Sequence, residues 1–131
     1  KLAALFTPGS HGSTFAGNPL GAAAGLATLD VIEDENLVAN AEARGEQLRD
    51  GIMATGNPLF VSVRGRGLLD AVELKHPCSH AVMNYCLEHG LIVNAVAPNA
   101  LRFAPPLIVT AQDVDQALAI LKDVPTDLPD D

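Results

Sequence analysis

The first residues that could do chemistry lie in a loop near the start of the chain. Residues 11–19 read HGSTFAGNP, so hydroxyl groups and glycines lead directly into an expected helix. Backbone N–H groups at a helix N-terminus, the helix dipole and the hydroxyls of Ser13 and Thr14 make a favourable setting for an anion such as phosphate. The alternative is an ordinary loop in which Asn18 only caps the helix, and the spacing fits neither glycine motif of nucleotide-binding proteins.

Arg102 is the second candidate, because it stands inside the apolar run 101–106, LRFAPP. In a strand, Leu101 and Phe103 point to one face and Arg102 points to the other. We expect a buried arginine here, whose planar guanidinium could grip the carboxylate of an acidic or amino-acid substrate with two parallel hydrogen bonds. The alternative is an arginine on the solvent face of an edge strand.

Metal ligands and nucleophiles do not form a recognisable set. His76, His80 and His89 are spaced four and nine residues apart around an expected helix start, which suits no metal site, so we assign them to surface or structural roles. Cys78 and Cys86 lack a metal-ligand spacing and are too few for a disulfide scaffold. The sequence by itself shows no complete catalytic apparatus.

Composition limits the classes to which the protein can belong. The chain has 131 residues, 8 Lys and Arg against 16 Asp and Glu, a net charge of −8 and 48% hydrophobic residues, which fits one modest globular domain. The acidic balance argues against a nucleic acid or an anionic membrane as partner, and we expect no membrane-spanning helix. The few cysteines fit a reducing cytoplasm. Because the chain starts with Lys1 and not with methionine, we expect a fragment of a longer protein.

Four helices are expected to position the candidate residues. Small apolar residues predict the first over 19–33, and an apolar stripe predicts the second over 34–54. A third is expected over 79–90, with Ser79 as its cap and a glycine at its end. A capping box at Thr110–Asp113 opens the last helix.

Short apolar runs predict four strands, over residues 60–64, 68–74, 91–96 and 100–103. The first two are joined across 65–67, so we expect an antiparallel hairpin, with the arginines of its RGRG motif in solvent and not on a phosphate. The order ααββαββα indicates an α+β fold with helices on one side of a small, mainly antiparallel sheet. The segment 125–131 is expected to be a polar, frayed end.

Several motifs, in order along the chain, resemble the C-terminal part of the class III pyridoxal-phosphate-dependent aminotransferases. They are PGSHGSTFAGNPLGAAA at 8–24, VRGRGLLDAVEL at 63–74, GLIVN at 90–94 and LRFAPPL at 101–107. The resemblance extends from about Phe6 to Leu121. Within the family, the motifs most resemble those of the acetylornithine aminotransferases of arginine biosynthesis. It implies the C-terminal small domain of a fold type I transferase. Relatives usually carry Met-Leu-Gly or similar at 69–71, where this chain has Leu-Asp-Ala.

The resemblance implies a role for each candidate site. Ser13 and Thr14 would reach the phosphate of pyridoxal phosphate in the neighbouring subunit, so the parent enzyme would be a homodimer whose sites are each built from two chains. Arg102 would form the ion pair with the substrate carboxylate. The implied reaction converts N-acetylornithine and 2-oxoglutarate into N-acetylglutamate semialdehyde and glutamate, in the cytoplasm.

The resemblance also implies how the chain is organised. Residues 1–18 would end the cofactor loop of the large domain, 19–55 would be connecting helices, 56–124 the small α/β domain and 125–131 a tail. The lysine that carries the cofactor in the family lies upstream of these motifs, and the lysines at 1, 75 and 122 match no such motif. We therefore expect no catalytic residue in this chain, no metal, and no transaminase activity from the chain alone.

Alternatives stay open at this point. Ornithine, succinylornithine and 4-aminobutyrate aminotransferases share the same motifs. From a different class, the chain could be a non-catalytic module that binds a phosphate-bearing ligand or mediates dimerisation, or a plain structural domain.

Overall fold

The first helix, α1 (Pro19–Asp34), begins where the sequence predicts. Asn18 has extended backbone angles, and its side-chain oxygen accepts a hydrogen bond from the Gly21 N–H at 2.8 Å, which confirms the expected cap. The computed structural model describes residues 5–131, so the first four residues of the expected 1–18 segment lie outside the described part. Two compact units divide the chain, Lys1–Glu35 and Asn36–Asp131.

The second helix, α2 (Leu37–Ala54), starts three residues later than expected. The reason is local, because Asn36 adopts the left-handed conformation with a φ of 52°, which interrupts the helical path after α1. Asparagine tolerates that region better than most residues do. The unit boundary coincides with this break and groups α2 with the strands.

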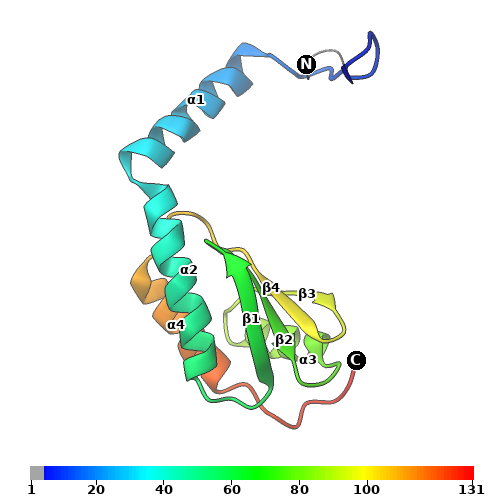
Figure 1. Ribbon diagram of the computed structural model, residues 1–131, viewed down its shortest axis with the longest axis vertical. Coiled ribbons are helices and arrows are strands. Elements are labelled where there is room, and N and C mark those ends of the chain that lie inside the picture. Colours follow the sequence, from blue (N-terminus) through cyan, green and yellow to red (C-terminus); the bar gives the residue numbers. More distant parts are fainter. Residues whose placement is uncertain (1–4) are drawn as a thin grey trace. The chain divides into compact units, whose positions relative to one another are not determined.

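Unit 36–131 contains three helices and one sheet, and the elements follow along the chain in the predicted order (Figure 1). After α2 come β1 (Phe60–Arg66), β2 (Leu69–Leu74), α3 (Ser79–Glu88), β3 (Asn94–Ala97), β4 (Ala100–Phe103) and α4 (Ala111–Lys122). The strands lie in the order β1-β2-β4-β3, and every neighbouring pair is antiparallel. The predicted α+β class is therefore confirmed.

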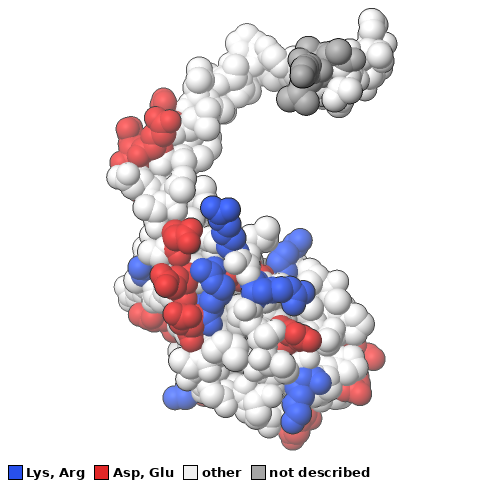
Figure 2. Space-filling view, in the orientation of Figure 1, with Lys and Arg blue, Asp and Glu red and all other residues white. Residues whose placement is uncertain are grey.

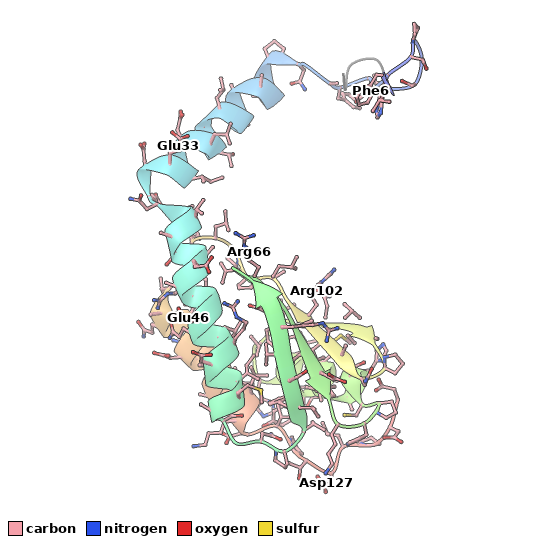
Figure 3. The ribbon with its side chains drawn as sticks, in the orientation of Figure 1. Phe6, Glu33, Glu46, Arg66, Arg102 and Asp127 are labelled. Carbon is pink, nitrogen blue, oxygen red and sulfur yellow. The ribbon has the colours of Figure 1, made fainter. Side chains whose placement is uncertain are left out.

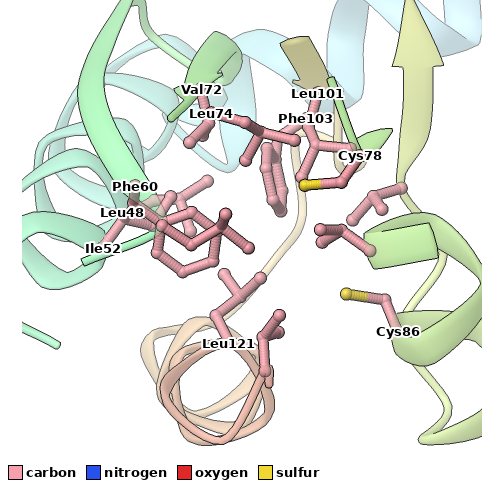
Figure 4. Packing of buried hydrophobic residues seen from close by; sticks show 14 of the residues in the cluster. Leu48, Ile52, Phe60, Val72, Leu74, Cys78, Cys86, Leu101, Phe103 and Leu121 are labelled. Atoms are coloured by element: carbon pink, nitrogen blue, oxygen red, sulfur yellow. The ribbon is translucent and has the colours of Figure 1, made fainter. Parts of the chain in front are cut away.

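The core lies between the sheet and its helices, where alternate strand residues point inward (Figure 4). Val72 and Leu74 of β2 meet Leu101 and Phe103 of β4, and all four are at most 6% exposed. The helices supply the rest of this cluster, namely Leu48, Ile52, Val82, Cys86, Val114 and Leu121. Both thiols are free and buried, and burial raises the pKa of the Cys86 thiol to about 11, which leaves it protonated and unreactive at neutral pH.

The hairpin between β1 and β2 is tighter than expected. Arg66 pairs with Leu69, so the turn consists of Gly67 and Leu68 only, and the predicted link over 65–67 is wrong. Gly67 has a φ of 56° at the first central position, where type II′ turns favour glycine. β1 consequently runs to Arg66, beyond its predicted end at residue 64.

The start of α3 and the last residues of the chain also differ from expectation. Cys78 takes the cap position in place of Ser79, and the Asp131 carboxylate accepts hydrogen bonds from the backbone N–H groups of His80 and Ala81. Burial raises the pKa of Asp131, but these bonds and that from Ser79 outweigh it and lower the pKa to about 2. Leu128 packs against the core, so the segment 125–131 is docked and not frayed.

β3, the strand that precedes the one with Arg102, is shorter than predicted. It begins at Asn94, and the residues from Leu91 to Val93 lie before it. The register of β3 shifts between Ala95 and Ala97, which marks a bulge. The expected capping box of the last helix is confirmed, because Thr110 and Asp113 exchange side-chain and backbone hydrogen bonds.

Candidate functional site

Arg102 lies on the face of the sheet opposite the core (Figure 3). Leu101 and Phe103 are buried on either side of it, as predicted, but Arg102 itself is exposed, so the expectation of a buried arginine is wrong. Its strand, β4, lies between β2 and β3, so Arg102 stands on an interior strand and not on an edge strand. An interior strand is paired on both sides and gives the guanidinium a rigid base.

The charge of Arg102 has no acidic partner in the part of the chain that the structure describes. Its Nη2 donates to Oδ1 of Asn94 at 3.3 Å, and its neighbour on the other side, across β2, is Ala71. A neutral amide and a methyl group leave the positive charge uncompensated. Such a guanidinium is available to a carboxylate or another anion.

A hollow of about 370 Å³ opens beside Arg102. Asn94, Arg102 and the carboxylate of Asp113 provide polar atoms on its wall, and most of the remaining wall is apolar, including Ile92, Pro105, Pro106 and Val109. A small ligand with one carboxylate and an aliphatic chain matches this combination.

Two more arginines share this face of the sheet, which we call the open face and define by Arg64, Arg66, Ala71, Glu73, Asn94 and Arg102. Arg64 lies opposite Ala71, which lies opposite Arg102, so one row crosses the sheet. Arg64 and Arg102 both border a shallow depression of about 540 Å³. Several basic side chains lie near one another on the visible surface of unit 36–131, with acidic side chains beside them (Figure 2). Arg64 and Arg66 are exposed, as predicted.

The hydroxyl-rich loop belongs to the other compact unit and is described by itself. Ser13 and Thr14 are exposed, and neither hydroxyl forms a hydrogen bond with another described residue. Gly17 has a φ of 73°, and Asn18 bonds both back to Phe15 and forward into α1. The loop is therefore held at its helix end while its hydroxyl donors stay available, which suits a phosphate group.

One charged pair was missed by the sequence analysis. Asp70 is 1% exposed on β2, and its Oδ1 lies 3.0 Å from Nη1 of Arg49 on α2. Its Oδ2 has no hydrogen-bond partner among the described residues. The two residues are 21 positions apart, so no local pattern links them. The signal was the aspartate itself, which stands at a core position of an otherwise apolar strand.

His76 and His80 have structural roles, and no cluster of metal-binding side chains occurs within residues 5–131. His76 and His80 lie 2.7 Å and 3.1 Å from the carboxylates of Asp130 and Asp131 and help to dock the C-terminal segment. None of the described helices is long and apolar enough to cross a bilayer.

Comparison with known proteins places this geometry in a family. Residues 1–124 match the family model of class-III aminotransferases. The acetylornithine aminotransferase of Gloeobacter violaceus is 45% identical over 129 residues, which cover 96% of this chain and 32% of that protein. The ornithine aminotransferase of Staphylococcus carnosus is 46% identical over 123 residues, which cover 92% of this chain and 30% of that protein.

Solved structures agree in fold. The acetylornithine aminotransferase from Elizabethkingia anophelis matches with a TM-score of 0.78 and 38% identity, over 92% of this chain and 33% of that one. The ornithine aminotransferase of Toxoplasma gondii, whose structure shows partial occupancy of PLP at the active site, matches with a TM-score of 0.80 and 35% identity, over 92% of this chain and 29% of that one. The chain spans about a third of the length of these relatives. It belongs to the class-III aminotransferases, a family of pyridoxal-phosphate-dependent enzymes.

Proposed function

We propose that the chain is the C-terminal portion of an acetylornithine aminotransferase. The whole enzyme transfers an amino group from N-acetylornithine to 2-oxoglutarate and forms N-acetylglutamate semialdehyde and glutamate. Support comes from relatives of that name at 45% and 48% identity, each of which is about three times as long as this chain. An ornithine aminotransferase at 46% identity makes ornithine the second candidate donor.

The observation that carries the proposal is the guanidinium of Arg102, which has no acidic partner among residues 5–131 and lies beside a mostly apolar hollow. Both proposed substrates are carboxylates, and they occupy the site in turn. The planar fork of Arg102 can bind each carboxylate with two hydrogen bonds, while the apolar wall accepts the aliphatic chain. Arg102 therefore orients either substrate in the same way.

The proposal also assigns Ser13 and Thr14 to the binding of the cofactor. Their hydroxyls form no hydrogen bond with another described residue, and together with the nearby N-terminus of α1 they fit a phosphate group, so these residues would hold the phosphate of pyridoxal phosphate. When bound, that cofactor takes the amino group from the donor and passes it to the acceptor. Residues 1–18 would reach the cofactor of a neighbouring subunit in a homodimer. Residues 19–55 would be helices that connect this loop to the small domain, which residues 56–124 would form, and residues 125–131 would be the tail.

The test uses the full-length enzyme that carries this chain, with pyridoxal phosphate bound. We expect Arg102→Ala to lower kcat/KM for both substrates by about 100-fold or more, because a charge-assisted bidentate contact is lost. Arg66→Ala is the matched control, since this exposed arginine shares the open face and borders neither hollow. Equal effects of the two variants would contradict the proposal. Competition between N-acetylornithine and ornithine then decides the donor.

The chain alone is expected to be inactive, because it offers no lysine in the family's cofactor motif. Purified chain with added pyridoxal phosphate should show no turnover of N-acetylornithine above background. Turnover above background would overturn this part of the proposal.

A further inference from the structure

We propose that Asn94 is a positioning residue for the substrate carboxylate: its amide oxygen orients the Arg102 guanidinium without neutralising it. This inference rests on the proposed role of Arg102. It assigns a function to the residue that faces Arg102 across the sheet.

The sheet fixes the distance between the two residues. Asn94 and Arg102 are directly paired across β3 and β4, and side chains in such pairs interact on the same face. Oδ1 of Asn94 accepts the hydrogen bond from Nη2 of Arg102 at 3.3 Å, and both residues line the 370 Å³ hollow. Arginine has five N–H donors, so this contact leaves the others for a ligand.

No other side chain directly paired with Arg102 in the sheet can do this. Ala71, its partner on the β2 side, has no polar group. Arg64 stands two strands away, about 10 Å between backbones, and carries the same charge. Asn94 is therefore the residue that restricts the guanidinium.

The acids near the site are engaged elsewhere. Glu73, on the open face, accepts a hydrogen bond from the Ser62 hydroxyl at 2.9 Å. Asp113, on the wall of the hollow, accepts from the backbone and the hydroxyl of Thr110 in the capping box. Neither pairs with Arg102 in the described chain, so its charge stays available.

The chemistry explains why an amide suits this position. An aspartate at position 94 would have nearly the same shape and could hold the guanidinium equally well. It would also satisfy the positive charge and repel an incoming carboxylate. An asparagine supplies the orientation without that competition.

The test compares two variants of the full-length holoenzyme, Asn94→Asp and Asn94→Ala, with glutarate as a carboxylate probe that cannot react. We expect Asn94→Asp to raise the inhibition constant of glutarate about tenfold, with an unchanged or higher melting temperature, because the new ion pair stabilises the fold. Asn94→Ala should raise the constant about threefold, and its effect on KM should be larger than its effect on kcat.

The control is Asn99→Asp, which adds the same charge in the turn between β3 and β4, at an exposed residue whose side chain forms no hydrogen bond in the described part. A purely structural role for Asn94 cannot move stability and affinity in opposite directions. Equal effects of Asn99→Asp and Asn94→Asp on glutarate, or an unchanged constant in Asn94→Ala, would overturn the inference. The role of Arg102 fails separately, if Arg102→Ala leaves glutarate binding intact.

Discussion

Replacing Arg49 by methionine separates a buried carboxylate from its counter-ion and leaves the surrounding packing nearly unchanged. The Asp70 side chain is fully buried and that of Arg49 is 21% exposed, with 3.0 Å between Oδ1 and Nη1. The same Nη1 donates to the Gly67 carbonyl at 3.0 Å. The substitution thus removes two hydrogen bonds that join α2 to the hairpin of β1 and β2.

The expected loss follows from the burial of the charge that remains. Breaking a buried ion pair by removing one partner costs 3 to 5 kcal/mol in typical cases, and the partial exposure of Arg49 favours the lower end, about 3 kcal/mol. Replacing both partners behaves differently, because no charge stays buried. The double variant Arg49→Met with Asp70→Leu should lie within about 1 kcal/mol of the wild type.

The assay is urea unfolding of the 131-residue chain at pH 7, followed by far-ultraviolet circular dichroism. The chain has no tryptophan and one tyrosine, so fluorescence would report poorly. Both single variants, the double variant and the wild type form a double-mutant cycle. A coupling near zero, or a loss below about 1 kcal/mol in Arg49→Met, would refute the reasoning that the pair is buried and coupled.

The pH dependence of the free energy of unfolding gives a second test of the pair Arg49–Asp70. Burial raises the pKa of Asp70 above 3.8, and the hydrogen bond and charge of Arg49 offset only part of this rise. The folded state therefore holds the proton more tightly than the unfolded state does. The contribution of Asp70 to the free energy of unfolding should fall as pH rises from 3.8 through the raised value, and Asp70→Asn should remove this fall.

Two further predictions concern close contacts in unit 36–131. Gly45→Ala should destabilise the chain by about 1 to 3 kcal/mol in urea unfolding, because a Cβ on Gly45 would lie 1.7 Å from the Gly67 carbonyl oxygen and α2 would have to move. Gly25→Ala in α1, where the Cβ meets nothing within 4 Å, should be neutral or stabilising. Asp131→Asn should lower the melting temperature at pH 7 but not below pH 2, because its lowered pKa stabilises the fold above 3.8 and that contribution is lost as pH falls to about 2. A difference that persists at pH 2 would contradict this.

Local signals in the sequence predicted most of the elements. The capping box needs only Thr110 and Asp113, three positions apart, and the start of α1 needs only Asn18 followed by a proline. Contacts of this kind form within one turn of chain, so they do not depend on the rest of the fold. The same holds for the alternation that separates Arg102 from its apolar neighbours.

Contacts between distant residues were not predictable in this way. The carboxylate of Asp131 replaces a local cap on α3 from about 50 positions away, and Asp70 finds Arg49 across 21 positions. Each depends on which elements pack together, and a one-dimensional pattern of polar and apolar residues contains no such information.

The sequence alone was enough to recognise the residue types at the candidate site. They are a hydroxyl-rich loop before a helix and an arginine between apolar residues. Tertiary structure decided what that arginine can do. The insertion of β4 between β2 and β3 exposes Arg102 on the open face, with Ala71 on one side and Asn94 on the other. Strand order and register are set by packing over the whole core, so the environment of a single side chain is determined only when all four strands are in place.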